Sequence, residues 1–427
     1  MKSTSTQSIA VIGGGITGVT TAYALAKRGF DVMLFEKNRY AAMETSFANG
    51  GQLSASNAEV WNHWSTLLKG LKWMLKSDTP LLVNPTPSWH KLSWFAEFIG
   101  NLPNYRRNTI ETTRLAIAAR EHLFAWAQAE GVDFDLKKEG ILHIYRDKKG
   151  FDHAGEVSKL LAQGGLQRRA VTPAEMKAIE PTLAGNYYGG YFTESDCTGD
   201  IHKFTHGMAV AIARMGVTCL YDQDVVNLHS LGDTATVTVE QGDSKQTHVF
   251  DGVVVCAGVQ SRTFAAQLGD RVNIYPVKGY SITVNLNDAQ SQASAPTVSL
   301  LDDETKLVTS RLGVDRFRVA GTAEFNGFNK DIRADRIRPL VEWVNQCFPG
   351  INTRQVVPWA GLRPMMPNMM PRVGRGAHSN VFYNTGHGHL GWTLSAVTAD
   401  MVAGVVQDAY SPALPGSRSK LELATQA

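Results

Sequence analysis

Cysteine and long apolar runs are both scarce in this chain. Its 427 residues include four cysteines that lie far apart and form no C-x-x-C pair, namely Cys197, Cys219, Cys256 and Cys347. This spacing argues against a structural zinc site or a disulfide framework, and it fits a reducing compartment. No apolar run reaches 18 residues, and no hydrophobic signal core precedes the first strand-like segment. We therefore expect a cytoplasmic protein without a membrane-spanning helix.

An excess of charge of one sign is also absent. Lys and Arg number 42 against 39 Asp and Glu, which gives a formal net charge of +3, and no basic block stands out. A nucleic-acid partner is therefore not indicated. The length and the 43% content of hydrophobic residues predict a large core divided between two domains, or three.

Glycine is concentrated in a motif near the start of the chain. Residues 8–37 read SIAVIGGGITGVTTAYALAKRGFDVMLFEK, in which Gly13, Gly15 and Gly18 fit G-x-G-x-x-G between an apolar strand and a helix. The first glycine allows a tight turn, the second lets the backbone approach a diphosphate, and the third lets the helix pack against the strand. Glu36 ends the second strand, where a carboxylate accepts hydrogen bonds from an adenosine ribose. This unit predicts FAD or NAD rather than NADP.

Three later segments extend the predicted cofactor site. The loop 44–56 is rich in small polar residues and glycine, the strand at 253–256 closes on Ala257-Gly258, and residues 384–393 read NTGHGHLGWT before a helix. The chain thus has two strand–glycine–helix units, and FAD, whose dinucleotide and flavin ring can each be held by one of them, explains this better than NAD does. The N–H groups of the second unit would stabilise the reduced flavin anion. We therefore expect FAD and no metal. The residues expected around the cofactor are Gly13, Gly14, Gly15, Ile16, Thr17, Gly18, Glu36, Lys37, Ser46, Asn49, Gly50, Gly51, Gln52, Leu53, Val226, Ala257, Gly258, Gly361, Gly386, His387, Gly388, His389, Leu390, Gly391, Trp392 and Thr393.

Three side chains are candidates for catalysis. Arg363 lies in the apolar stretch WAGLRP, where a buried guanidinium needs an anion, either a substrate carboxylate or a protein carboxylate. His389 either lies beside the flavin or the substrate, or it only packs within its glycine turn. Tyr280 begins the half-buried strand YSITVN and either touches the substrate or belongs to the core.

The motifs, taken in order, resemble the flavin-dependent D-amino acid oxidase and dehydrogenase superfamily, above all the small subunits of bacterial D-amino acid dehydrogenases. The stretches that carry the resemblance are VIGGGITG, ETSFANGGQLS, TGDIHKFT, VVCAGVQS, YPVKGYSIT, GLRPMMPNMMPRVGR and NTGHGHLGWT. The resemblance implies non-covalent FAD, a substrate carboxylate on Arg363, and the histidine turn over the flavin ring. Residues 366–369 read MPNM where the family has Thr-Pro-Asp-Gly, so the identity of the substrate stays open at this point.

The implied reaction is oxidation of an amino acid, expected to be a D-amino acid. Hydride transfer from Cα to the flavin N5 gives an imine, which hydrolyses to a 2-oxo acid and ammonia, and it needs orientation rather than a metal or a nucleophile. Electrons would pass to a quinone or another carrier. The alternatives are oxidation of glycine, sarcosine, a cyclic imino acid or an L-amino acid, with oxygen as an acceptor, and a flavin-binding redox subunit that is active only with a partner chain.

The expected fold is α/β with two domains assembled from separate segments. Residues 1–60, 195–275 and 355–427 are predicted to form a Rossmann-like FAD-binding domain. Residues 61–194 and 276–354 are predicted to form a substrate-binding domain with a mixed or antiparallel sheet.

The segment STLLKGLKWMLKSD, residues 65–78, predicts an amphipathic helix. Its leucines share one face and Lys69, Lys72 and Lys76 the other. Such a helix suits either peripheral contact with the inner face of a membrane or an ordinary cap on the core.

Overall fold

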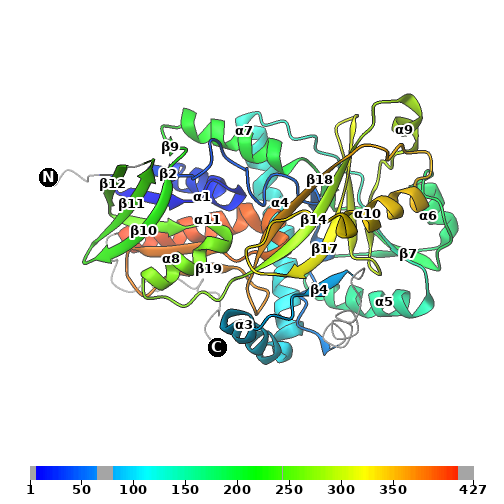
Figure 1. Ribbon diagram of the computed structural model, residues 1–427, viewed down its shortest axis with the longest axis horizontal. Helices are drawn as coiled ribbons and strands as arrows, with labels where there is room; N and C mark the ends of the chain where they lie inside the picture. Colours follow the sequence, from blue (N-terminus) through cyan, green and yellow to red (C-terminus); the bar gives the residue numbers. More distant parts are fainter. Residues whose placement is uncertain (1–5, 65–79, 243, 412–427) are drawn as a thin grey trace.

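The computed structural model describes residues 6–64, 80–242 and 244–411. The predicted amphipathic helix at 65–78 lies outside these residues. Two large sheets lie side by side along the long axis of the molecule (Figure 1). No helix among the described residues is both long and apolar enough to cross a membrane.

The first sheet has six strands in the order β19-β20-β13-β1-β2-β9. All neighbouring strands are parallel except β19, which is antiparallel to β20. Its strands are β1 (Ser8–Ile12), β2 (Asp31–Phe35), β9 (Thr218–Leu220), β13 (Gly252–Val255), β19 (Arg372–Arg375) and β20 (Val381–Thr385). The sequence predicts β1, β2 and β13 as continuous apolar runs because both faces of this sheet are buried.

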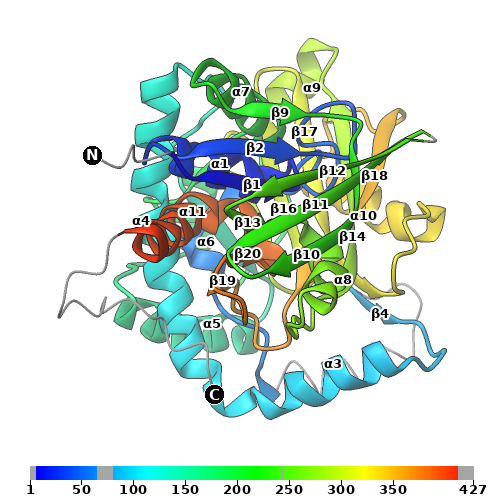
Figure 2. The same ribbon diagram turned by 90° about the vertical axis from the view of Figure 1, so that its left-hand side faces the viewer.

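Alternate residues of these strands face two different cores. Ile9 and Val11 pack with the helices, whereas Ala10 and Ile12 pack with the small sheet. The helices on the first face are α1 (Ile16–Ala26), α4 (Tyr105–Glu130), α7 (Ile201–Arg214) and α11 (Gly391–Tyr410). The other face carries an antiparallel sheet of β10 (Asp224–Leu231), β11 (Thr234–Gln241) and β12 (Ser244–Phe250), together with α8 (Ser261–Gln267). Figure 2 shows the three layers.

The second sheet has nine strands, and it is mixed. Its order is β18-β14-β17-β16-β15-β5-β7-β6, with β4 on β17. These strands are β4 (Leu81–Val83), β5 (Ile141–Tyr145), β6 (Arg169–Val171), β7 (Gly189–Thr193), β14 (Tyr275–Asn285), β15 (Ser299–Asp302), β16 (Leu307–Leu312), β17 (Arg316–Phe325) and β18 (Val356–Met365). Helices α3 (Trp89–Gly100), α5 (Lys148–Gln163), α6 (Pro173–Ile179), α9 (Ala289–Ser294) and α10 (Ala334–Cys347) lie around it. The two-stranded pair β3 (Gln52–Leu53) and β8 (Cys197–Thr198) completes the strands.

The predicted α/β class, with a Rossmann-like sheet and a second mixed sheet, is confirmed. The domain boundaries stay a prediction. Strand β18, which lies within 355–427, pairs with β14 from Val356 to Met365 in the second sheet. This pairing brings Arg363, near the end of β18, to the region between the two sheets.

Candidate active site

The turn between β1 and α1 is shaped by glycines that tolerate no side chain. Gly13 has φ of 108°, and a Cβ at this position would lie 2.8 Å from the Cys256 carbonyl oxygen. A Cβ on Gly18 would lie 1.7 Å from the carbonyl oxygen of Gly13. Helix α1 starts at Ile16, whose N–H donates to Ser46 Oγ at 3.0 Å. The turn therefore brings bare backbone and a helix N-terminus to the carboxyl end of β1, where a diphosphate is stabilised.

Glu36 lies directly after β2 and is held in place by backbone donors. Its Oε2 accepts a hydrogen bond from the Gly14 N–H at 2.6 Å, and its Oε1 accepts one from the Asn38 N–H at 2.9 Å. The carboxylate lines the cavity and has acceptor capacity left for ribose hydroxyls. Val226, one of the residues predicted around the cofactor, does not line the cavity. Val225 does, because Val226 lies at a register shift between β10 and β11.

A cavity of about 380 Å³ runs from Glu36 to the histidine turn. Sixteen of the predicted cofactor residues line it: Gly13, Gly15, Ile16, Thr17, Glu36, Lys37, Ser46, Asn49, Ala257, Gly258, Gly386, His387, Gly388, His389, Gly391 and Trp392. Its glycine cradle, helix N-terminus and acidic end fit an elongated dinucleotide such as FAD. We call it the cofactor cavity.

A second cavity of about 260 Å³ continues between the first sheet and the second. The two cavities share Thr45, Asn49, Arg363, His389 and Trp392. Gly50, Gly51, Gln52, Gly361, Leu390 and Thr393, predicted beside the cofactor, line the second cavity instead. Gly14, Gly18 and Leu53 line neither cavity. We call this space the substrate cavity, because its junction with the cofactor cavity is where a small molecule would meet the reactive end of the dinucleotide.

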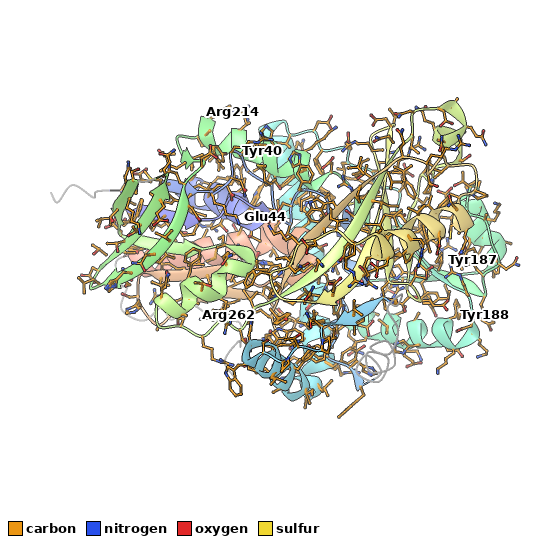
Figure 3. The ribbon with its side chains drawn as sticks, in the orientation of Figure 1. Tyr40, Glu44, Tyr187, Tyr188, Arg214 and Arg262 are labelled. Atoms are coloured by element: carbon orange, nitrogen blue, oxygen red, sulfur yellow. The ribbon has the colours of Figure 1, made fainter. Side chains whose placement is uncertain are left out.

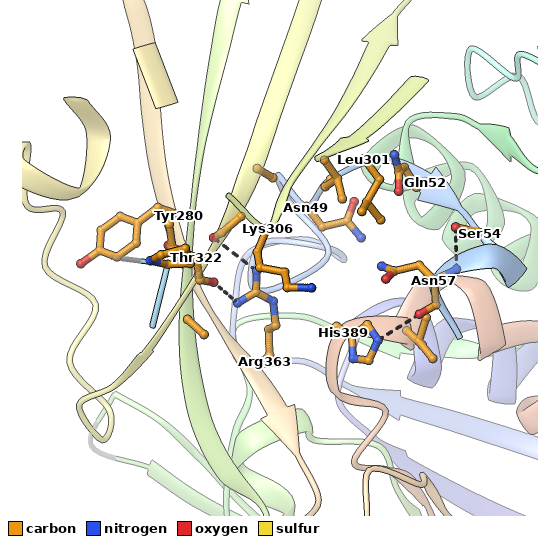
Figure 4. A pocket seen from close by; sticks show the side chains of 18 of the residues that line it. Asn49, Gln52, Ser54, Asn57, Tyr280, Leu301, Lys306, Thr322, Arg363 and His389 are labelled. Atoms are coloured by element: carbon orange, nitrogen blue, oxygen red, sulfur yellow. Dashed lines mark hydrogen bonds between the residues drawn. The ribbon is translucent and has the colours of Figure 1, made fainter. Parts of the chain in front are cut away.

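Arg363 is positioned at the junction by the second sheet. Its Nη1 donates to the Thr322 carbonyl oxygen at 2.8 Å and its Nη2 to that of Gly321 at 3.4 Å (Figure 4). These carbonyls are available because the β14–β17 register shifts between Lys278 and Tyr280, and Thr322 adopts φ of 59°, which is rare for a β-branched residue. A Cβ on Gly279 would lie 2.4 Å from Arg363 Nη1, so the guanidinium occupies the space that a side chain at position 279 would need.

The charge of Arg363 has no counterion among the described residues. No carboxylate of the described chain lies within 4.0 Å of it, and burial lowers its pKa to about 10. It still carries a proton at neutral pH. The sequence left two candidate anions for this arginine, a protein carboxylate and a substrate carboxylate. The described chain provides no protein carboxylate, so a bound substrate carboxylate would neutralise the guanidinium.

His389 and His387 flank Gly388 in different environments. His389 stacks on Trp61, with ring centroids 5.0 Å apart, and its Nε2 donates to the Asn57 carbonyl oxygen at 3.2 Å. Burial lowers the pKa of His389 to about 4, so the neutral ring keeps Nδ1 as an acceptor. His387 is buried, and its Nε2 lies 2.9 Å from Thr398 Oγ1. His389 thus lines both cavities as a neutral side chain, whereas His387 supports the turn.

Tyr280 lines the substrate cavity, but its hydroxyl is bonded on the side away from Arg363. Its hydroxyl donates to Glu324 Oε2 at 2.8 Å, and its ring points away from Arg363 (Figure 4). Strand alternation is the reason: Gly279 faces the guanidinium, and the next residue faces the opposite side of the sheet. The hydroxyl therefore does not reach the junction.

Other residues at the site are not predicted from the sequence. Asp196 is buried, accepts hydrogen bonds from Ala55 N–H and Ser56 N–H, each at 3.0 Å, and so holds the short turn that presents Asn57 to His389. Glu59, Asp303 and Lys306 line the substrate cavity. No local motif marks these residues, because Glu59, Asp196 and the β15–β16 turn with Asp303 and Lys306 come from three separate stretches of the chain.

Known proteins resemble this chain in sequence over most of its length. The profile of the family described as "DAO: FAD dependent oxidoreductase" matches residues 8–405. "D-amino acid dehydrogenase 3" of Mesorhizobium japonicum is 63% identical over 398 residues, which cover 93% of this chain and 96% of that protein. "D-amino acid dehydrogenase" of Paramagnetospirillum magneticum is 39% identical over 412 residues, covering 93% and 95%.

Solved structures share the fold at low identity. Glycine oxidase from Geobacillus kaustophilus has a TM-score of 0.74 at 20% identity and covers 94% of this chain and 95% of its own. L-proline dehydrogenase from P. horikoshii has a TM-score of 0.73 at 17% identity, covering 94% of each chain.

Proposed function

Because this chain belongs to the DAO family of FAD-dependent oxidoreductases, we propose that it is a dehydrogenase of D-amino acids. FAD is its cofactor and amino-acid oxidation its class of reaction. The two relatives named above support the D configuration, since both are D-amino acid dehydrogenases by name. The observation that carries the proposal is Arg363, a guanidinium without a counterion in the described chain, at the junction of a dinucleotide cavity and a small cavity.

Arg363 would bind the substrate carboxylate through its two terminal nitrogens. The carbonyls of Thr322 and Gly321 hold the guanidinium in one orientation, so the bound carboxylate sets the direction of Cα toward the junction. His389 presents a neutral ring there, and its Nδ1 is free to accept a hydrogen bond from the amine. Trp61 and Leu301 line the walls and limit access of water.

When bound, FAD supplies the hydride acceptor for the Cα–H bond. Arg363 and His389 orient the carboxylate and the neutral amine, and the product imine leaves for water, where it hydrolyses to a 2-oxo acid and ammonia. We propose a quinone or another carrier as the electron acceptor, consistent with the names of the relatives. We further propose a cytoplasmic location with peripheral contact at the inner membrane face.

The test is a panel of D- and L-amino acids with an artificial dye acceptor, run with and without oxygen. We expect dye reduction with D-amino acids by the purified chain alone, unaffected by removing oxygen. Turnover of L-amino acids, glycine or sarcosine only would reject the D configuration. Activity that requires a second protein would favour a redox subunit, and hydrogen peroxide without dye would indicate an oxidase.

A further inference from the structure

A buried charged cluster adjoins the substrate cavity, which its Tyr280 lines, and takes no part in the proposed reaction. Lys278 and Glu324 are 0% and 1% exposed, and Lys278 Nζ lies 3.2 Å from Glu324 Oε1. Tyr280, also buried, donates to the other carboxylate oxygen of Glu324. A buried ion pair costs desolvation energy that its own attraction only partly offsets. Because the pair itself adds little stability, its role is to be found in the segments of the chain that it contacts.

The cluster holds the loop 326–333, which connects β17 to α10. Lys278 Nζ donates to Asn329 Oδ1 at 2.8 Å and to the Asp331 carbonyl oxygen at 3.1 Å. Asn326 Nδ2 donates to Glu324 Oε1 at 3.1 Å. The loop is thus fixed on both sides of Lys330.

The fixed loop reaches the cofactor cavity, although it starts from the second sheet. Phe328 and Lys330 both line that cavity. Lys330 Nζ lies 2.5 Å from Glu44 Oε2, and Lys37 Nζ lies 3.1 Å from the other oxygen of Glu44. Glu44, labelled in Figure 3, has a side chain that is 39% exposed, so this ion-paired group lies where the cavity meets solvent. Two lysines on one carboxylate leave one positive charge at the cavity wall.

This charge lies close to the expected position of the diphosphate. Ser46 lies two residues after Glu44, and its Oγ accepts a hydrogen bond from the N–H of Ile16 at the start of α1. The helix N-terminus and the segment 44–46 thus meet on the same stretch of the cavity, where a diphosphate is stabilised. Lysine binds phosphate oxygens as a point charge on a flexible stem, so Lys330 can turn from Glu44 to the ligand.

We propose that Lys330 is a ligand of the FAD diphosphate, that Phe328 covers the cofactor beside it, and that the Lys278–Glu324–Tyr280 cluster positions both. The FAD site is then completed by a loop of the second sheet. Tyr280 acquires a role as a positioning residue, on the face of β14 opposite to the guanidinium.

The first test is the Kd of FAD, measured by quenching of flavin fluorescence on titration into apoprotein at low and high salt. Lys330→Gln is expected to raise this Kd at least tenfold at low salt and to reduce its dependence on salt. Lys330→Arg, which keeps the charge, should stay close to wild type. The control Lys159→Gln removes an exposed, ion-paired lysine of α5 and should leave the Kd within twofold. A Lys330→Gln protein with wild-type Kd and salt dependence would overturn the proposal.

The second test addresses the positioning role. Tyr280→Phe removes only the hydroxyl and is expected to weaken FAD binding about threefold or more. If the cluster acts through the loop, the two effects overlap, so the double variant Tyr280→Phe/Lys330→Gln binds FAD more tightly than the product of the two single effects predicts. Independent, multiplying effects would reject the link, and so would a Tyr280→Phe protein with unchanged Kd. If circular dichroism shows that Lys330→Gln does not fold, the same double-mutant cycle is run with Phe328→Leu. An unchanged Kd for Phe328→Leu would then reject a contribution of the loop 326–333 to FAD binding.

Discussion

At the scale of single residues, Arg363 carries the proposed chemistry through geometry as much as charge. Two backbone carbonyls and the absence of a side chain at Gly279 fix the plane of the guanidinium. We predict that Arg363→Lys lowers kcat/KM for the best D-amino acid at least tenfold, about 1.4 kcal/mol or more, because lysine keeps the charge but loses the two-point contact. The visible spectrum of the bound flavin should not change. Steady-state kinetics with a dye acceptor measure the effect, and Arg114→Lys on the exposed face of α4 serves as control. Wild-type efficiency in Arg363→Lys would remove this arginine from the site.

His387 leads to a prediction about stability and pH. It is 4% exposed, and burial lowers its pKa from 6.5 to about 3. As pH falls below the value for the unfolded chain, the unfolded state binds a proton that the native state excludes. Stability is therefore lost on acidification, by at most about 1.4 kcal/mol per pH unit for this group.

We expect His387→Asn to show a shallower loss of unfolding free energy between pH 6.5 and 4.5 than wild type. Urea titrations in saturating FAD measure it, and the exposed His229 provides the matched control through His229→Asn. Parallel pH curves for wild type and His387→Asn would contradict the buried, neutral state.

At the scale of elements, the β1–α1 unit depends on close approach of backbone to backbone. A Cβ on Gly18 would meet the Gly13 carbonyl at 1.7 Å, whereas one on Gly404, in α11, meets nothing within 4 Å. We predict that Gly18→Ala purifies with less than a tenth of the FAD of wild type or does not fold. Gly404→Ala should retain FAD and be as stable as wild type or more stable, by up to about 1 kcal/mol, because alanine is the better helix former. Flavin content per chain and thermal unfolding test both. Full FAD content in Gly18→Ala would refute the proposed geometry.

A second prediction at this scale concerns membrane contact. On α3, Trp89, Leu92 and Ile99 are 81%, 54% and 48% exposed, and the basic segment 65–78 precedes this helix in the sequence. Three lysines near anionic lipid contribute about 1 kcal/mol each at low salt. We expect the protein to sediment with anionic vesicles at low salt and to dissociate at high salt.

Neutral vesicles are the lipid control, and changing Lys69, Lys72 and Lys76 together to Glu should abolish sedimentation while dye-linked turnover persists. If the wild-type protein does not bind anionic vesicles at low salt, the membrane contact is rejected in favour of the alternative interpretation of 65–78 as a cap on the core.

At the scale of the whole molecule, the cofactor cavity draws on residues from Ile12 to Trp392 and on both sheets. A ligand held in this way ties distant segments together and stabilises the folded chain by mass action. We predict non-covalent FAD: acid precipitation should release all the yellow colour into solution, and the Tm of apoprotein should rise steadily with added FAD. Colour retained in the pellet, or a Tm independent of FAD, would contradict this.

The cofactor and the core of the first sheet are determined by the sequence alone. The turn at Gly13–Gly18, the strand ending before Glu36 and the glycine turn before α11 each depend on neighbours within about 30 residues, so local pattern rules predict them. The arginine in its apolar stretch is marked by the cost of burying a charge.

Only the tertiary structure decides where those residues point and what faces them. Tyr280 turns away from the site because the regular β14–β18 pairing places Gly279 on the face of Arg363 and the next residue on the opposite face. Lys330 and Asp196 reach the site through contacts with residues far away in the chain, Glu44 for the first and Ala55 for the second. Such contacts depend on strand register and loop paths, which are set by the packing of the whole chain rather than by any local run of residues.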